Sequence, residues 1–144
     1  GMSEPVFPTP EAAEDAFYAA FEARSLDDMM AVWARDDHVA CIHPLAAPLN
    51  GRAAVAAGWR SMFGAAGRFR LQVKAVHEIR QADHVIRIVD EFLTIGDETA
   101  PRPAILATNV YRREADGWRM VLHHASPLQV GAKAGADTPP VVFH

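Results

Sequence analysis

The stretch that decides the fold is residues 104–127, AILATNVYRREADGWRMVLHHASP, in which two runs of strand-forming residues flank Asp116 and Gly117. An Asp-Gly pair between apolar, β-branched and aromatic runs is a strong signal of a β-hairpin. Side chains alternate along a strand, and in this hairpin both faces are mainly apolar. We therefore expect helices of the same chain to cover one face and a second partner to cover the other.

Upstream of the hairpin, the apolar residues first recur with the period of helices. Residues 10–24 are predicted to form a helix, because Thr9 suits an N-cap and Pro10 suits the first helical position. A second, short helix is expected to open at Ser25, and a third at residues 50–51.

The strands are expected between and after these helices. Residues 39–43 are predicted to form a short strand, and residues 68–75 and 84–95 alternate with the period of two. Helices followed by a long sheet predict an α+β fold, with the helices packed on one face of an antiparallel sheet. We expect an arm at residues 1–9, one domain at 10–127 and a tail at 128–144 that is poor in large apolar residues.

Composition limits the classes of function. With 144 residues, of which 50% are hydrophobic and 22% charged, the chain resembles an ordinary globular domain. A formal net charge of −4 argues against nucleic-acid binding, which needs a basic surface. The single cysteine favours a cytoplasmic setting, and no apolar run has the length of a membrane span.

Several polar residues in the predicted strands are candidates for chemistry. Asn109 shares a strand face with apolar residues, so its amide either pairs with backbone or contacts a ligand. His123 and His124 point to opposite faces, so only one of them can line a pocket, and its neighbours favour His123. Asp90 lies on an apolar face, where burial would raise its pKa as a general base requires, with Glu91 as the competing residue if the register differs by one.

Other candidates for chemistry are few. His43, just before Pro44, is a further possible base on the side of Cys41. The seven histidines form no HxxxH or HxH element, and there is no CxxC pair, phosphate loop or nucleophile elbow. We therefore expect neither a metal site nor a cofactor.

The hairpin also resembles a known family. Thr108, Val110, Tyr111, the Asp-Gly turn with Trp118, and His124 with Ser126 follow the order found in the SnoaL-like branch of the nuclear transport factor 2-like superfamily. The most similar member is the association domain of calcium/calmodulin-dependent protein kinase II. FYAAFEARSLDDMMAVWA (residues 17–34), CIHP (41–44) and LNG (49–51) extend the resemblance over about residues 10–127. It implies a cone-shaped, cystatin-like curved sheet whose mouth is closed by the helices, with a pocket between them.

The resemblance can be followed residue by residue. Ketosteroid isomerases of this superfamily use an Asp base and two oxyanion donors. The base matches residues 41–43 of this chain, which contain no carboxylate. The two donors match Phe17 and Asn109. The kinase association domain lines its cavity with arginines, where this chain has Ile88, Asn109 and Ala125, and Phe63 replaces its pocket Trp. The resemblance thus implies a less anionic ligand.

Three functions follow as expectations. The first is a dimeric binding protein for a small organic molecule, whose cavity is lined by Phe17, Trp33, Trp59, Phe63, Asn109 and Tyr111. The second is a proton-transfer enzyme of isomerase, cyclase or dehydratase type that uses His43, Asp90 or His123. The third is an assembly module. A homodimer is expected in all three, and an open cavity with a buried, shifted carboxyl or histidine would favour catalysis.

Overall fold

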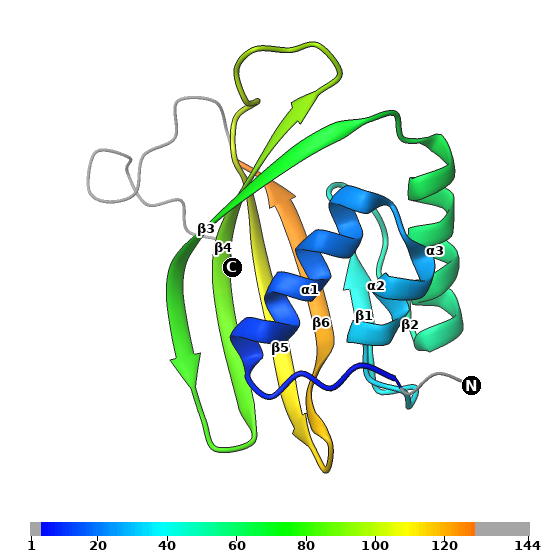
Figure 1. Cartoon of the computed structure of the whole chain (residues 1–144), viewed down its shortest axis with the longest axis vertical. Helices are drawn as coiled ribbons and strands as arrows, with labels where there is room; N and C mark the ends of the chain where they lie inside the picture. Colours follow the sequence, from blue (N-terminus) through cyan, green and yellow to red (C-terminus); the bar gives the residue numbers. More distant parts are fainter. Residues whose placement is uncertain (1–3, 129–144) are drawn as a thin grey trace, which may run out of the picture.

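The computed structural model describes residues 4–128 and places three helices before a six-stranded sheet (Figure 1). The helices are α1 (Pro10–Ala23), α2 (Leu26–Val32) and α3 (Arg52–Ala65). The strands are β1 (Ala40–Ile42), β2 (Leu49–Asn50), β3 (Phe69–Arg80), β4 (His84–Ile95), β5 (Ile105–Glu114) and β6 (Gly117–Pro127). The predicted α+β class is confirmed. Of the predicted tail, only Leu128 belongs to the described residues.

The sheet has the strand order β2-β1-β6-β5-β4-β3. The long strands β3 to β6 pair antiparallel, as expected, but β1 runs parallel to β6 and makes the sheet mixed. The register shifts once between β3 and β4 and once between β5 and β6. Such bulges increase the local twist and bend of a sheet, which helps it to curve around the helices.

The hairpin turn depends on a glycine. Gly117 has a φ of +116°, and a Cβ at this position would lie 2.5 Å from the backbone oxygen of Phe7. The Trp118 N–H donates a hydrogen bond to that same oxygen at 2.8 Å. The Asp-Gly signal therefore marks both the turn and the place where the N-terminal segment is held against the sheet.

Side-chain caps start the first two helices where the sequence indicates. Thr9 Oγ1 accepts a hydrogen bond from the Ala12 N–H at 3.0 Å, and Ser25 Oγ accepts one from the Asp28 N–H at 3.2 Å. Each cap satisfies a backbone donor that the first helical turn leaves free. The third helix begins after Gly51, which has a positive φ.

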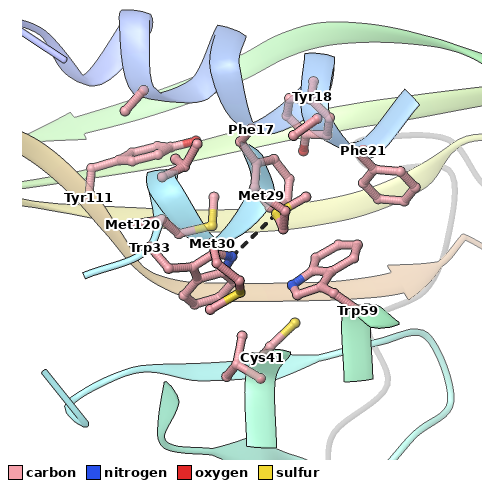
Figure 2. Packing of buried hydrophobic residues seen from close by; sticks show 14 of the residues in the cluster. Phe17, Tyr18, Phe21, Met29, Met30, Trp33, Cys41, Trp59, Tyr111 and Met120 are labelled. Carbon is pink, nitrogen blue, oxygen red and sulfur yellow. Dashed lines mark hydrogen bonds between the residues drawn. The ribbon is translucent and has the colours of Figure 1, made fainter. Parts of the chain in front are cut away.

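The core lies between the helices and the inner face of the sheet, with Phe17, Trp33, Trp59, Tyr111 and Met120 completely buried (Figure 2). The outer face of the sheet carries apolar side chains that are partly exposed and do not belong to this core. They are those of Ile86, Ile88, Phe92, Leu106, Val110 and Leu122. In the described part of the chain, no helix covers that face (Figure 1). No helix among residues 4–128 is long and apolar enough to cross a membrane.

Candidate functional site

A cavity of about 260 Å³ opens between α1, α3 and the inner face of the sheet. Its wall is mainly apolar and contains Phe21, Met62, Phe69, Leu93, Ile95, Ile105 and Ala125, together with the polar side chains of Glu91, His43 and His123. This volume exceeds the about 150 Å³ of a dry apolar cavity that holds benzene. The site therefore has room for a small ring-sized molecule. The three polar groups of its wall can orient that molecule.

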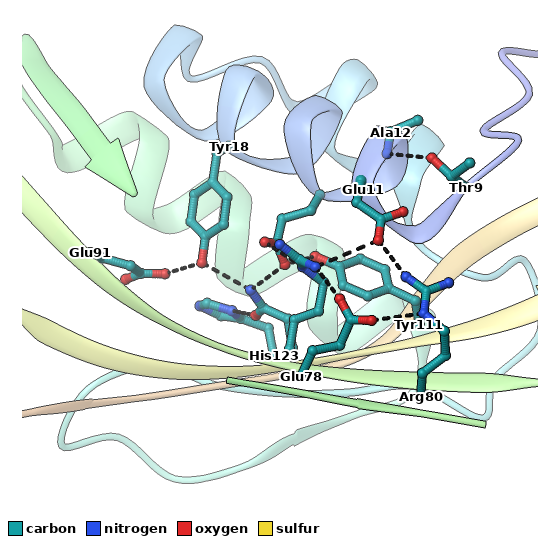
Figure 3. Close-up of polar contacts among 12 residues, drawn as sticks. Thr9, Glu11, Ala12, Tyr18, Glu78, Arg80, Glu91, Tyr111 and His123 are labelled. Carbon is teal, nitrogen blue, oxygen red and sulfur yellow. Dashed lines mark hydrogen bonds and ion pairs between the residues drawn. The ribbon is translucent and has the colours of Figure 1, made fainter. Parts of the chain in front are cut away.

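Glu91 is the acidic group of this wall, and only 2% of its surface is exposed. The hydroxyl of Tyr18 donates a hydrogen bond to Glu91 Oε2 at 2.6 Å (Figure 3). Burial raises the pKa of Glu91 to about 7, although the Tyr18 hydrogen bond acts in the opposite direction. Near neutral pH the carboxyl group is thus present in both protonation states, as proton transfer requires.

His123, on β6, is the buried histidine of the wall, with 1% of its surface exposed. Its Nδ1 lies 2.6 Å from Oδ1 of Asn109. Burial lowers the pKa of His123 to about 3, so the imidazole is neutral at physiological pH.

His43, which follows β1, is half-buried and contacts the ring of Trp59 at a centroid distance of 4.7 Å. Burial lowers the pKa of His43. Its Nε2 lies 3.7 Å from Cys41 Sγ, but burial raises the pKa of the Cys41 thiol to about 12, with a smaller contribution from Glu91. Cys41 is therefore not a thiolate nucleophile at neutral pH.

Behind the wall, Tyr18 and Asn109 join a buried polar network, of which Figure 3 labels Tyr18, Tyr111, Glu91 and His123. Nδ2 of Asn109 donates to the Tyr18 hydroxyl oxygen at 2.9 Å and to Glu14 Oε2 at 3.4 Å. Glu14 also accepts a hydrogen bond from the Tyr111 hydroxyl at 2.7 Å and one from Arg87 Nε at 2.9 Å. The network connects the cavity residues with the buried side of α1.

Two of the three predicted catalytic residues, His43 and His123, line the cavity, and Asp90 does not. Asp90 lies on the outer face, paired in register with Lys74 and Leu106, and Glu91 occupies the inner face instead. The interpretation of Asp90 is corrected for a physical reason. Its apolar strand neighbours form the uncovered outer face of the sheet, rather than the side that packs against the helices.

None of the six residues predicted to bind a ligand lines the cavity. Phe17, Trp33, Trp59, Asn109 and Tyr111 are completely buried, and neither they nor the half-buried Phe63 line the cavity wall. The rings of Phe17, Trp59 and Phe63 pack against one another or against wall residues, as Phe17 does against His123 at a centroid distance of 4.9 Å. These residues support the wall and do not line it.

Sequence reasoning missed Glu14, Tyr18 and Phe21. Their spacing on α1 was the available signal, because residues three and four positions apart share one helix face, and Phe21 is a large apolar residue on that face. A carboxylate and a phenol on the buried side of a helix indicate a buried polar network. Among the described residues, no group of three or more His, Cys, Asp or Glu side chains could hold a metal ion.

Comparison with known proteins places these features in context. The SnoaL-like domain model matches residues 11–130. The F-box protein SKIP8 of Arabidopsis thaliana is 27% identical over 128 residues, which are 89% of this chain and 51% of SKIP8. The chain thus spans about half the length of this curated relative.

Solved structures share the fold. A proposed dehydratase of the NTF2-like family from Streptomyces avermitilis is 27% identical with a TM-score of 0.72, and the match covers 83% of this chain and 93% of that chain. A ketosteroid isomerase-like protein from Erwinia carotovora atroseptica is 18% identical with a TM-score of 0.68 and the same two coverages. A protein with a cystatin-like fold from Nostoc punctiforme is 16% identical, with a TM-score of 0.71, over 82% of this chain and 74% of that chain. The last two likenesses concern the fold alone.

Proposed function

The chain belongs to the SnoaL-like domain family of the nuclear transport factor 2-like superfamily, and we propose that it binds a small, mostly apolar organic molecule and transfers a proton to or from it through Glu91. One observation carries this proposal. A buried carboxyl group stands in the wall of an apolar cavity that also contains the imidazole of His123, and its one hydrogen bond among the described residues comes from Tyr18.

The binding part of the proposal rests on the composition of the wall. Apolar side chains from α1, α3 and strands β3 to β6 surround the ligand space, and the polar groups lie on β4, on β6 and after β1. Burial of a ring against such a wall supplies affinity, while the few polar groups select and orient the ligand. Among residues 4–128, no Arg or Lys is part of the wall, which favours a neutral ligand over an anionic one.

The catalytic part rests on the protonation of Glu91. A general base or acid is most effective when its pKa lies near the working pH, and burial brings the pKa of Glu91 to about 7. Glu91 lies on β4, so the carboxylate that is missing from residues 41–43 is provided by another strand. The similar structure from Streptomyces avermitilis is named as a proposed dehydratase, and a dehydration includes proton transfers.

The test is a proton-exchange experiment with 2-hydroxycyclohexanone as the probe, a ring-sized ketone that also carries a hydroxyl donor. Deuterium incorporation at its α-carbons in D₂O is followed by NMR with the wild type, Glu91→Gln and Asp90→Asn. The wild type should accelerate exchange, Glu91→Gln should lose about 10²-fold or more of that acceleration, and Asp90→Asn on the outer face should keep it. Equal acceleration by the wild type and Glu91→Gln would contradict the role of Glu91.

The outer face of the sheet supports a second function, self-assembly. Ile88, Val110 and Leu122 form part of an apolar surface that the described helices leave open, and we infer that a second copy of the chain covers it. The resemblance to the kinase association domain points to the same role. Sedimentation at micromolar concentration should give a dimer, and Ile88→Glu should shift it towards the monomer; a monomeric wild type would contradict the proposal. The cytoplasmic setting stays a prediction.

A further inference from the structure

Glu14 lies outside the cavity, yet it contacts three polar side chains of the buried network. It is 5% exposed and pairs with Arg87, whose Nε lies 2.9 Å from Oε1. Its Oε2 accepts hydrogen bonds from Tyr111 and Asn109. A carboxylate paired with a guanidinium can only accept hydrogen bonds, so every neighbouring group must turn a donor towards Glu14.

This requirement determines the orientation of the Asn109 amide. An amide has an NH₂ end that donates and an oxygen end that accepts. Since Glu14 accepts, the NH₂ end must face Glu14 and the Tyr18 hydroxyl oxygen, and Oδ1 must face His123. The opposite orientation would place an oxygen against a carboxylate in a buried site, which is costly.

The amide orientation in turn determines the tautomer of His123. Oδ1 of Asn109 cannot donate, so Nδ1 of His123 must carry the proton that occupies the 2.6 Å contact. A neutral imidazole has only one ring proton, and therefore Nε2 carries a free lone pair. Along the other branch, the Tyr18 hydroxyl accepts from Asn109 and donates to Glu91 Oε2, which leaves Oε1 of Glu91 as the oxygen that gains or loses the proton.

We propose that Glu14 is a positioning residue that, through Asn109, holds His123 in the Nδ1–H tautomer, so that the cavity binds ligands whose polar group donates a hydrogen bond to Nε2, as a hydroxyl does. The ligand class rests on the function proposed above, whereas the tautomer does not. With Nε2 as an acceptor and Glu91 ionised, both buried polar groups select donors. A carbonyl compound without a hydroxyl would leave the Nε2 lone pair unpaired.

The first experiment measures the tautomer directly. Long-range ¹H–¹⁵N NMR spectra of histidine-labelled protein distinguish Nδ1–H from Nε2–H imidazoles, and His123→Gln assigns the signal. The wild type should show Nδ1–H. In Glu14→Gln the oxygen of the new side-chain amide should keep accepting from Arg87 Nε, so its NH₂ end faces Asn109 and most molecules should change to Nε2–H. Tyr111→Phe is the matched control, because it removes another hydrogen bond to Glu14 without freeing Asn109, and the tautomer should stay.

The possible outcomes are distinct. The proposal would be overturned if His123 of the wild type carried its proton on Nε2. It would also be overturned if Glu14→Gln folded and His123 kept the Nδ1–H tautomer. Arg87 keeps ion pairs with Glu11 and Glu78 in that variant, which favours folding. If Glu14→Gln does not fold, Glu14→Met also removes the acceptor and gives the same test. The wild-type spectrum decides the tautomer in any case.

The second experiment tests the ligand class with two probes of similar shape, cyclohexanol and cyclohexanone. At about pH 8.5, where Glu91 is ionised, the wild type should bind the alcohol about tenfold more tightly than the ketone. The preference should fall in Glu14→Gln and persist in Tyr111→Phe. A wild type that prefers the ketone would overturn the assigned ligand class. If neither probe binds, the proposed binding function is contradicted, while the tautomer measurement still decides the role of Glu14.

Discussion

Replacement of Glu91 by glutamine should make the protein more stable at high pH, and by an amount that the burial of the carboxyl group determines. Glutamine has nearly the same shape and keeps an oxygen that accepts the hydrogen bond of the Tyr18 hydroxyl. The substitution therefore removes the ionisation of residue 91 with little change in packing. Any pH-dependent difference from the wild type then reports the cost of a buried negative charge.

The magnitude follows from proton linkage. Burial raises the pKa of Glu91 from 4.5 to about 7 in the folded state, so between these values the folded protein binds more protons than the unfolded chain. Wild-type stability must then fall as the pH rises from 4.5 to 7, and stay reduced above 7. This is the opposite of a salt-bridged carboxylate. The difference between the unfolded and folded pKa of Glu91 corresponds to a loss of about 3 kcal/mol in the free energy of unfolding. Glu91→Gln should not show this loss.

Urea denaturation followed by tryptophan fluorescence at several pH values between 4.5 and 8.5 measures the difference. His123 titrates in the opposite sense, because burial lowers its pKa to about 3 and stability is lost as the pH falls below 6.5. That contribution is common to both proteins and cancels to first order in the comparison. Asp90→Asn, on the outer face of the same strand, serves as the control for the loss of a carboxyl group outside the cavity. A flat difference between the wild type and Glu91→Gln would refute the buried, proton-binding carboxyl.

Three further substitutions test the fold, each by urea denaturation. Trp118→Ala should cost about 3–5 kcal/mol, because the ring is 9% exposed; a loss near zero would show that the hairpin is misread. Gly117→Ala should cost more than about 1 kcal/mol, because φ is positive and the added methyl group meets the Phe7 backbone, and wild-type stability would contradict the tight contact. Arg52→Ala should cost about 2 kcal/mol, because the guanidinium donates to three carbonyls at and just after the end of α2; an unchanged midpoint would mean that water satisfies these carbonyls equally well.

Much of the fold could be predicted from local signals in the sequence. The turn at Gly117, the caps at Thr9 and Ser25 and the change from helical to strand period each depend on a few neighbouring residues. These signals determine where elements begin and end. They also predicted that His123 rather than His124 faces the pocket, because the neighbours of His123 on its own strand are apolar.

Only the tertiary structure decided which face of β4 is the inner one. Alternation separates Asp90 from Glu91 with certainty, but both strand faces carry apolar residues, and the sequence of one strand contains no information on which face meets the helices. Only the tertiary structure likewise decided that β1 pairs parallel to β6. It also decided which aromatic residues fill the core and which line the cavity. The contact of Glu14 with Asn109 joins positions 95 residues apart. Local periodicity determines secondary structure from neighbouring residues. The buried network and its chemistry arise only when packing buries side chains that are distant in the sequence against one another.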